Sequence, residues 1–176
     1  DHRLSKNYWP GWHLFGAALD PTQDTMNENL DEVLGVWGDV WIAYSAGGAF
    51  QDLPLDIGIG YYLALSQNKT LSLEGNPVIS SDFSDADLQL DKGWNLKANP
   101  IVTIVDKSTL EVLDENGDSK SWNDAVLSGW IAPHIIGFFE DSHYPAEQIV
   151  PFGGYWFHTS RELTVKVRPH LPLDDS

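Results

Sequence analysis

The sequence predicts a mainly β protein, an internally duplicated antiparallel β module with a few short helices. Three observations favour this fold class. Short motifs recur in the same order along the chain, several runs alternate apolar and polar residues as strands do, and turn formers are abundant. The chain has 18 Asp against 8 Glu, with 15 Gly and 10 Pro, which is typical of loops between strands rather than of helix surfaces.

The internal repeat consists of four pairs of matching segments. Gly-Trp-His-Leu at 11–14 recurs as Gly-Trp-Asn-Leu at 93–96. The other pairs are Trp-Ile-Ala at 41–43 and 130–132, Gly-Tyr-Tyr-Leu and Gly-Tyr-Trp-Phe at 60–63 and 154–157, and Leu-Ser-Leu and Leu-Thr-Val at 71–73 and 163–165. After each Trp-Ile-Ala, we expect the match to continue without a gap through Gly48 and Gly137. Four matches in one order predict a duplication, with insertions in the second copy.

The strands expected in the first copy are short runs bounded by turn residues. A run rich in β-forming residues at 40–44 is followed by the small residues of a hairpin turn at 45–48. A second strand is expected at 60–65, then a turn at 66–69 and a third strand at 70–73. The same pattern predicts a hairpin in the second copy, with strands at 154–158 and 163–167.

Two short helices are expected where acidic and apolar residues are spaced helically. One spans 27–34, with Asn27 as its N-cap. The other spans 122–127, with Ser121 as its N-cap. Neither is long enough to change the prediction of a mainly β fold.

The repeat predicts three segments. Residues 1–77 form the first β repeat, 78–92 a connecting segment rich in Ser and Asp, and 93–170 the second β repeat. Each copy has about 80 residues and few core side chains, so we expect the copies to pack together as one unit. The pattern does not distinguish a sandwich from two packed small barrels.

Composition and charge exclude several classes of protein. A formal net charge of −16 repels phosphate backbones, so nucleic-acid binding is not expected. No apolar stretch is long enough to span a membrane, and no Cys is present to form disulfides or zinc sites. No basic segment leads into an apolar core at the start, so no signal peptide is expected in this sequence. The absence of an initiator Met, together with the polar ends, predicts a piece of a longer chain. We expect that chain to be secreted or at the cell surface, with neighbouring domains as partners. The lack of Cys and the high acidity would also suit a bacterial cytosol.

The repeated motifs resemble those of a known kind of module. Gly-Trp-Asn-Leu near the start and Gly-Tyr-Trp before a final Leu-Thr-Val strand recur in tandem β modules of secreted multidomain bacterial proteins. The resemblance spans most of residues 11–168. It implies an accessory module with no assigned catalytic residue. His13 departs from the usual Asn, and the insertion at 103–125 has no counterpart in the first copy.

The aromatic residues divide into a repeated and an unmatched set. Both copies must solve the same packing problem, so the repeated aromatics are expected in the core: Trp12, Trp41, Tyr61, Trp94, Trp130, Tyr155 and Trp156. The unmatched aromatics are better candidates for the surface: Tyr8, Trp9, Trp37, Tyr44, Trp122, Phe138 and Tyr144. Exposed Trp and Tyr faces bind sugar rings, with polar neighbours for the hydroxyls. The candidate binding residues are therefore Trp37 with Asp39, Tyr44, Trp122, and Tyr144 with Asp141 and His143.

Two acidic segments are candidates for a cation. Asp114, Asn116 and Asp118 alternate as the first ligands of a calcium loop do, with Asp124 as the acid further along. The glycine of this loop is one place early, so an Asn-Gly turn is the other interpretation. The cluster of Asp82, Asp85 and Asp87 is either a second cation site or a solvated linker. Calcium is the cofactor considered.

These residues predict a non-catalytic accessory module that binds carbohydrate, a polysaccharide or glycan, through exposed aromatic side chains. One alternative is a purely structural or protein-docking module in which the aromatics are core. Another is a small glycan-acting hydrolase that uses a carboxylate pair, because the chain holds 26 acids. No nucleophile elbow, phosphate loop or His-based metal motif is present. We therefore assign no catalytic residue from the sequence.

Overall fold

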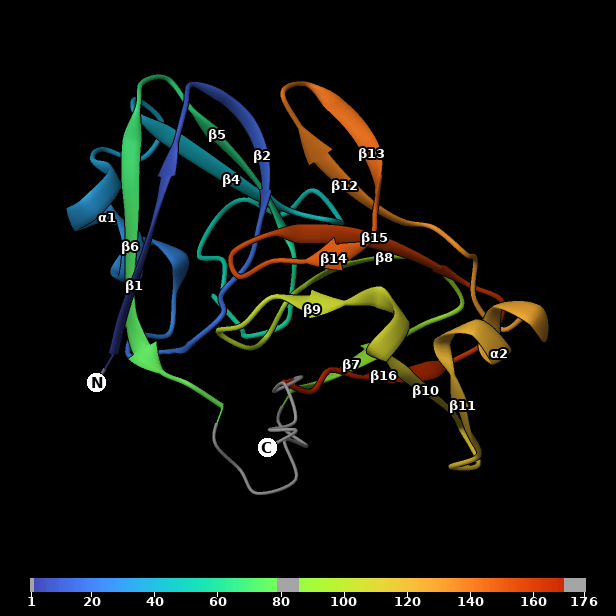
Figure 1. The fold of residues 1–176 in the computed structure, drawn as a ribbon. Helices are drawn as coiled ribbons and strands as arrows, with labels where there is room; N and C mark the ends of the chain where they lie inside the picture. Colours follow the sequence, from blue (N-terminus) through green and yellow to red (C-terminus); the bar gives the residue numbers. More distant parts are fainter. Residues whose placement is uncertain (1, 79–85, 170–176) are drawn as a thin grey trace, which may run out of the picture.

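The structure is a computed structural model, which describes residues 2–78 and 86–169. Its first copy has two small antiparallel sheets, with α1 against β6 (Figure 1). One sheet has the strand order β1-β6-β3 and the other β2-β5-β4. In chain order, the elements are β1 (His2–Tyr8), β2 (Gly11–Phe15), β3 (Asp20–Pro21), α1 (Met26–Leu34), β4 (Trp41–Ser45), β5 (Tyr61–Leu65) and β6 (Lys69–Asn76).

The second copy also has two main sheets, with the orders β11-β10-β16-β7 and β13-β12-β15-β8, and a small β14-β9 pair. Its first elements are β7 (Asp87–Leu90), β8 (Gly93–Ala98), β9 (Val105–Asp106), η2 (Lys107–Thr109), β10 (Glu111–Asp114) and β11 (Ser119–Ser121). They are followed by α2 (Trp122–Leu127), β12 (Ile135–Phe139), β13 (Ser142–Ala146), β14 (Gln148–Ile149), β15 (Gly154–Thr159) and β16 (Leu163–Lys166).

Each element of the first copy has a counterpart in the second, in the same order. The counterparts of β1, β2, β3, α1, β4, β5 and β6 are β7, β8, β10, α2, β12, β15 and β16. The strand registers agree, because Leu4 pairs with Leu73 as Leu88 pairs with Val165. The predicted mainly β fold and its duplication are confirmed. The second copy adds β9, β11, β13 and β14.

Two equivalent tyrosines hold the chain in front of β5 and β15. The Tyr61 hydroxyl accepts a hydrogen bond from the backbone N–H of Asp56 at 3.1 Å. The Tyr155 hydroxyl accepts one from the backbone N–H of Val150 at 2.8 Å, five residues before it in each case. Both rings are buried, so the expected core role of these residues is confirmed.

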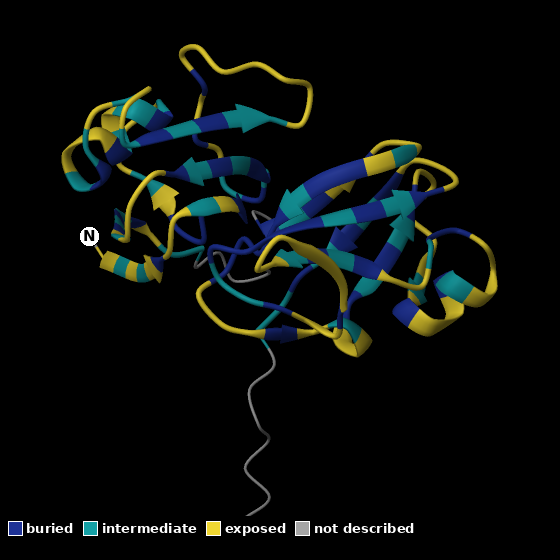
Figure 2. Ribbon diagram, turned by 90° about the horizontal axis from the view of Figure 1, so that it is seen from above, coloured by how far each residue is buried: buried dark blue, intermediate teal, exposed yellow. Residues whose placement is uncertain are grey.

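Each copy has its own hydrophobic core between its two sheets, as a small sandwich has. Buried and part-exposed residues alternate along the strands that face it (Figure 2). Phe152 of the second copy belongs to the core of the first, where it stacks on Phe15 with ring centroids 6.3 Å apart. Core residues include Leu30, Leu63 and Leu73 in the first copy and Trp122, Phe157 and Val165 in the second.

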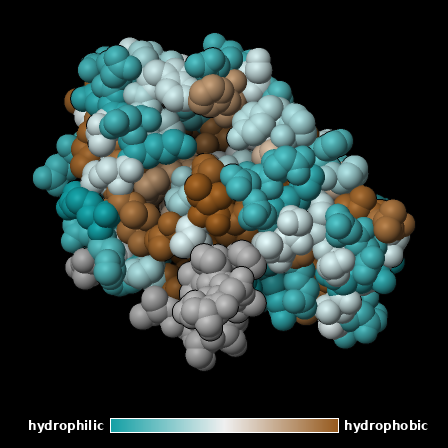
Figure 3. All heavy atoms as spheres, in the orientation of Figure 1, coloured by the Kyte–Doolittle hydropathy of each residue, from teal (hydrophilic) through white to brown (hydrophobic). Residues whose placement is uncertain are grey.

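An approximate two-fold relation joins the copies. The backbone N–H of Gly16 donates to the carbonyl of Phe152 at 3.2 Å, and that of Ala98 donates to the carbonyl of Gly58 at 3.0 Å. Gly16 and Ala98 hold the same position at the ends of β2 and β8. A Cβ on Gly16 would lie 2.1 Å from the Cβ of Ala98, so the close approach requires glycine there. In Figure 3, the largest group of hydrophobic residues lies in the middle of the face, and hydrophilic residues make up most of the surface around it.

One sequence match is displaced by a residue. Ser66 and Ser160, which follow β5 and β15, donate their backbone N–H groups to the carbonyls of Val40 and Trp130, respectively. Trp130 therefore occupies the position of Val40, and not that of Trp41. Both Trp41 and Trp130 are nevertheless buried, as expected.

The displacement grows toward β12. The residue paired with Trp156 is Ile136, whereas the equivalent residue of β5 pairs with Tyr44. The expected gap-free match of Gly48 with Gly137 is therefore wrong. Additional residues before β12 shift the register. The Trp-Ile-Ala segments and the two glycines therefore match in sequence without occupying equivalent positions in the structure.

The boundary between the copies also differs from the expected one. β7 lies within the expected connecting segment 78–92, but it pairs with β16 as β1 pairs with β6. It therefore belongs to the second copy. Ion pairing supports this edge, since Arg168 Nη2 lies 2.8 Å from Asp87 Oδ1.

The helices begin close to the expected positions. α1 has Thr25, and not Asn27, as its N-cap, because Thr25 and Glu28 form a reciprocal capping box. Asn27 instead donates to Asp31 Oδ1 at 3.3 Å. Ser121 caps α2 as expected, accepting from the backbone N–H of Asp124.

Candidate functional site

The β2-β5-β4 sheet carries aromatic side chains on the face turned away from its core. Three of them, Trp12, Tyr44 and Tyr62, lie on that outer face. Tyr62 pairs with Tyr44 on one side and with Leu14 on the other, and Leu14 lies on the same face of β2 as Trp12, two residues before it. Phe15 and Tyr61 point the other way and are buried. The alternation of a strand thus gives each of these strands one ring inside and one outside.

The β12–β13 hairpin stands beside this face and turns it into a groove (Figure 1). Phe138 of β12 and His143 of β13 pair with each other and lie across from the three rings. The groove has a volume of about 580 Å³. Its other lining residues are His13, Leu14, Ser45, Ala46 and Gly48. Among the described residues that line it, none is Asp, Glu, Lys or Arg.

The rings continue out of the groove and across the junction between the copies. We call the series Tyr44, Trp12, Tyr62, Trp156 and Trp94 the aromatic row. Successive ring centroids lie 6.1, 6.4, 6.3 and 6.3 Å apart along it. Tyr62 contacts Trp156 where the two copies meet. Phe50 extends the row beyond Tyr44, and His158 lies against Trp94 at the other end.

The row corrects the expectation for two repeated tryptophans. Trp12 is 44 % exposed and Trp94 62 % exposed, so neither belongs to the core. Repetition does preserve their position, but that position is on the outer face. Trp156, also expected in the core, is half-buried beside them.

The residue after Trp12 and the residue after Trp94 are both buried, and each forms a hydrogen bond with the backbone. His13 Nε2 lies 2.8 Å from the carbonyl oxygen of Trp9, and Asn95 Nδ2 donates to the carbonyl of Asp91 at 2.8 Å. In both cases the partner is the carbonyl four residues earlier in the chain. His13 therefore keeps the side-chain to backbone hydrogen bond that Asn95 forms in the second copy. Burial lowers the pKa of His13, although its bond to Trp9 acts in the opposite direction.

The structure brings some of the sequence-predicted binding residues together. Tyr44 and His143 both line the groove. Tyr144 follows on the same hairpin, but its ring covers Gly137 and lines a smaller hollow of about 250 Å³ behind it. Asp141 is exposed at the turn of the hairpin.

The other predicted binding residues lie elsewhere. Trp122 is 2 % exposed and packs against Phe157, so it is a core residue and cannot act as a surface platform. Trp37 is half-buried against Trp41, between α1 and β4, and is not part of the groove lining. Asp39 is exposed in the same connection.

Four rings of the row were not among the candidates. A repeated position suggested a core role for Trp12, Trp94 and Trp156, and Tyr62 was assigned to neither set. A sequence signal existed nonetheless. In 11–15 the alternation places Trp12 and Phe15 on opposite faces, and a short strand with one buried face exposes one of them. Tyr61 and Tyr62, adjacent in β5, present the same choice.

The acidic loop of the second copy forms a tight turn. Asp114 Oδ1 accepts hydrogen bonds from the backbone N–H groups of Asn116 and Asp118, both at 2.9 Å. The turn joins β10 to β11, which agrees with the Asn-Gly turn interpretation. Asp124 lies in the first turn of α2. Within residues 2–78 and 86–169, no group of three or more His, Asp or Glu side chains converges as a metal site.

The second acidic cluster lies largely outside the described residues. Asp82 and Asp85 are not described. Asp87 lies in β7, where its carboxylate is paired with Arg168. This pairing gives Asp87 a role at the sheet edge.

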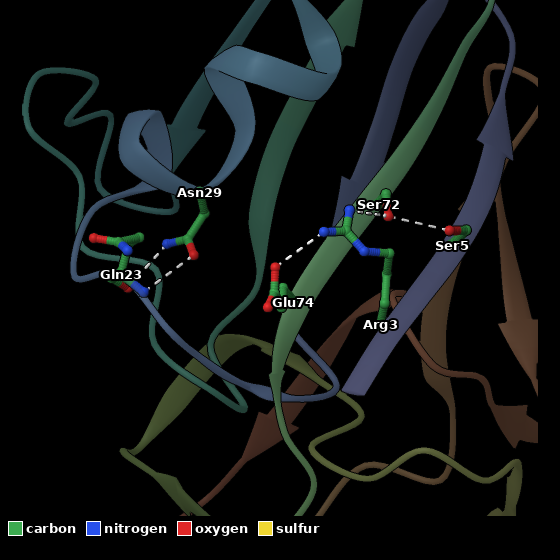
Figure 4. A network of polar contacts seen from close by, with 6 residues as sticks. All are labelled: Arg3, Ser5, Gln23, Asn29, Ser72 and Glu74. Atoms are coloured by element: carbon green, nitrogen blue, oxygen red, sulfur yellow. Dashed lines mark hydrogen bonds and ion pairs between the residues drawn. The ribbon is translucent and has the colours of Figure 1, made fainter. Parts of the chain in front are cut away.

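A polar hollow of about 350 Å³ lies between α1 and the β1-β6-β3 sheet. Arg3 donates to Glu74 Oε2 at 2.9 Å and to Ser72 Oγ at 3.1 Å, while Asn29 bonds the backbone of Gln23 (Figure 4). These side chains satisfy one another. We therefore interpret the network as support for strand pairing, and the aromatic groove as the candidate site.

Comparisons with known proteins assign no function to the chain. No protein-family model, curated protein or solved structure matches the chain. The resemblance to tandem Gly-Trp-Asn-Leu modules therefore stays a prediction. None of the helices in the described ranges is long and apolar enough to cross a membrane.

Proposed function

We propose that the chain is a non-catalytic module that binds an uncharged polysaccharide through the aromatic groove. The observation that carries the proposal is a line of part-exposed rings along a groove whose lining has no charged Asp, Glu, Lys or Arg side chain. Exposed aromatic patches of this kind mark binding sites on soluble proteins.

The groove offers both parts of a sugar site. The ring faces of Trp12 and Tyr62 suit the C–H faces of pyranose rings, since the electron-rich aromatic face attracts them. His143 and Ser45 supply polar groups at the edge for sugar hydroxyls. This division into flat apolar platforms and a few polar groups is typical of ligand pockets.

Charge supports a neutral ligand over an acidic one. The chain has a formal net charge of −16, which repels an anionic polymer at long range. The groove holds no Lys or Arg to compensate. We infer that uncharged glycans bind in preference to uronic-acid polymers. Uncharged polysaccharides of this kind occur outside cells, so the proposal includes a secreted or surface-exposed protein.

Hydrolysis receives no support from the groove. Glycoside hydrolysis requires two carboxyl groups that flank the scissile bond. The residues that line the groove include neither Asp nor Glu. A protein-docking module is the second candidate, because aromatic residues are also enriched in protein interfaces.

Tryptophan fluorescence tests the proposal with the intact chain. We would titrate it with hydroxyethyl cellulose, xylan, galactomannan and mixed-linkage β-glucan, and with polygalacturonate as the acidic comparator. The proposal expects a saturable change for at least one uncharged polymer and none for polygalacturonate. No saturable change with any polymer would overturn it in favour of protein docking.

Variants of neighbouring residues give the matched control. Phe138 lines the groove, whereas Phe139 is 53 % exposed on the opposite face of the same strand. We expect Trp12→Ala and Phe138→Ala to weaken binding about tenfold, as loss of a central aromatic contact does. Phe139→Ala should bind like the parent chain. Equal binding by all three variants would contradict a site in this groove.

A further inference from the structure

We propose that the two copies form one extended site, in which a linear uncharged polysaccharide chain lies across the junction and contacts rings from both. This inference rests on the proposed function and names its ligand more closely. It excludes two independent sites and a pocket for a single sugar. Three features of the structure support it.

The first is the continuity of the aromatic row. Tyr62 and Trp156 are equivalent residues of β5 and β15, and their ring centroids lie 6.3 Å apart. Beyond them lie Trp12 on one side and Trp94 on the other, each edge-on to its neighbour at 88° and 87°, respectively. A ligand on the Tyr62 ring is thus in reach of rings from both copies.

The second feature is the rigidity of the junction. The hydrogen bonds from Gly16 to Phe152 and from Ala98 to Gly58 attach the ends of β2 and β8 to the other copy. Gly60, two residues before Tyr62, also donates its backbone N–H to the carbonyl of Leu96 at 3.1 Å. The rings of the two copies are therefore held in place before a ligand arrives, which lowers the entropic cost of binding a long chain.

The third feature is that the two ends of the row are open. Phe50 is 46 % exposed beyond Tyr44, and Trp94 is 62 % exposed at the other end. A site of this shape accommodates several consecutive sugars, because each platform needs only one sugar face.

The halves of the site are not identical, which gives the bound chain a direction. In the first half, Tyr44 forms the outer platform and the β12–β13 hairpin forms a wall. In the second half, Ile136 takes the position of Tyr44. We expect the first half to bind more tightly and the second half to add affinity only for longer chains.

The test is the dependence of affinity on chain length, measured by calorimetry. The ligands are the di-, tetra- and hexasaccharides of whichever uncharged polymer binds best in the fluorescence panel. The parent chain should bind the hexasaccharide at least about tenfold more tightly than the disaccharide, with one oligosaccharide per chain. Two oligosaccharides per chain would overturn the single-site inference.

Trp94→Ala separates this inference from the proposed function. It should weaken hexasaccharide binding about tenfold and leave disaccharide binding unchanged, whereas Trp12→Ala should weaken both. Leu127→Ala is the control, since Leu127 is 84 % exposed and outside the row. If Trp12→Ala weakens binding and Trp94→Ala does not, the site is confined to the first copy and only this inference fails. If neither variant changes binding, the proposed function fails as well.

Discussion

The ring of Tyr62 contacts the ring of Trp156 across the junction of the two copies, with their planes inclined at 52°. Each ring follows a buried tyrosine, Tyr61 or Tyr155, whose hydroxyl holds the preceding loop. The inner residue of each pair therefore fixes the strand, and the outer one faces solvent. An approximate two-fold relation then brings the two outer rings together as one surface.

Substitution of the tryptophans should separate the outer face from the core. Trp41→Ala and Trp122→Ala should each lower the free energy of unfolding by about 3–5 kcal/mol, because both side chains are almost fully buried. Trp12→Ala and Trp94→Ala should lower it by about 1 kcal/mol or less, since both are exposed. Urea denaturation measures the difference. A large loss of stability in either exposed variant would show that the side chain packs in the core.

The sequence predicted the duplication well, because three of the four repeated motifs mark equivalent positions, whereas the Trp-Ile-Ala match is displaced by one residue. It did not predict which face of a strand each repeated aromatic occupies. Gly-Trp-x-Leu repeats equally well whether Trp12 lies inside or outside, and only the sheet that covers one face decides it. A three-dimensional neighbour, such as Phe15 in the core, is needed to make that choice.

The candidate site was predicted only in part for the same reason. Tyr44 was identified as an unmatched aromatic and His143 as a polar neighbour of Tyr144; both lie in the groove, but they come from different copies. Their proximity depends on the β12–β13 hairpin reaching the first copy, which is a long-range contact without a sequence signal. Trp122 failed as a candidate because α2 turns it inward onto Phe157.

Removal of the two buried hydroxyls should destabilise both copies. Tyr61→Phe deletes a donor to the carbonyl of Pro54 at 2.6 Å and an acceptor for Asp56. We expect a loss of about 1–2 kcal/mol from it, and a similar loss from Tyr155→Phe, because each substitution removes part-buried hydrogen bonds between a tyrosine hydroxyl and the preceding loop. Burial also raises the pKa of Tyr61 to about 12, so this hydroxyl should ionise only in strong base.

Tyr62→Phe is the matched control for the hydroxyl substitutions. Its ring is half-buried on the outer face, one residue from Tyr61. Urea denaturation should show no more than about 0.5 kcal/mol of change for this variant. If all three Phe variants were equally stable, the hydroxyls would not be holding the loops.

Enlarging Gly16 should strain the junction between the copies. Its Cβ would approach that of Ala98 to 2.1 Å and the carbonyl oxygen of Ile59 to 2.7 Å, and these backbones cannot move apart without breaking the paired hydrogen bonds. Gly16→Ala should therefore cost at least about 2 kcal/mol. Gly47→Ala is the control, because its nearest atom would be Ser45 Oγ at 4.0 Å. Equal melting temperatures for both variants would contradict the tight junction.

The Asp114 turn should stabilise the β10–β11 hairpin without calcium. Asp114→Ala leaves two backbone N–H groups without their acceptor and should lower stability by about 1–2 kcal/mol. Asp114→Asn keeps an acceptor oxygen and should lose less. Thermal melting in calcium and in chelator checks this. A calcium-dependent rise in melting temperature that Asp114→Asn abolishes would instead support the calcium-loop interpretation.

The buried His13 should make the first copy sensitive to acid. Burial lowers its pKa from the ordinary value of 6.5, so the unfolded chain binds the proton more tightly than the folded one. The stability contributed by neutral His13 is therefore complete above about pH 6.5 and is lost as pH falls toward the folded-state pKa. His13→Asn should keep the bond to the Trp9 carbonyl, as Asn95 does with Asp91, but should not titrate. Urea denaturation between about pH 8 and pH 5 should show the parent chain losing stability relative to this variant. Parallel pH profiles for the two chains would mean that the histidine is solvated in the folded state.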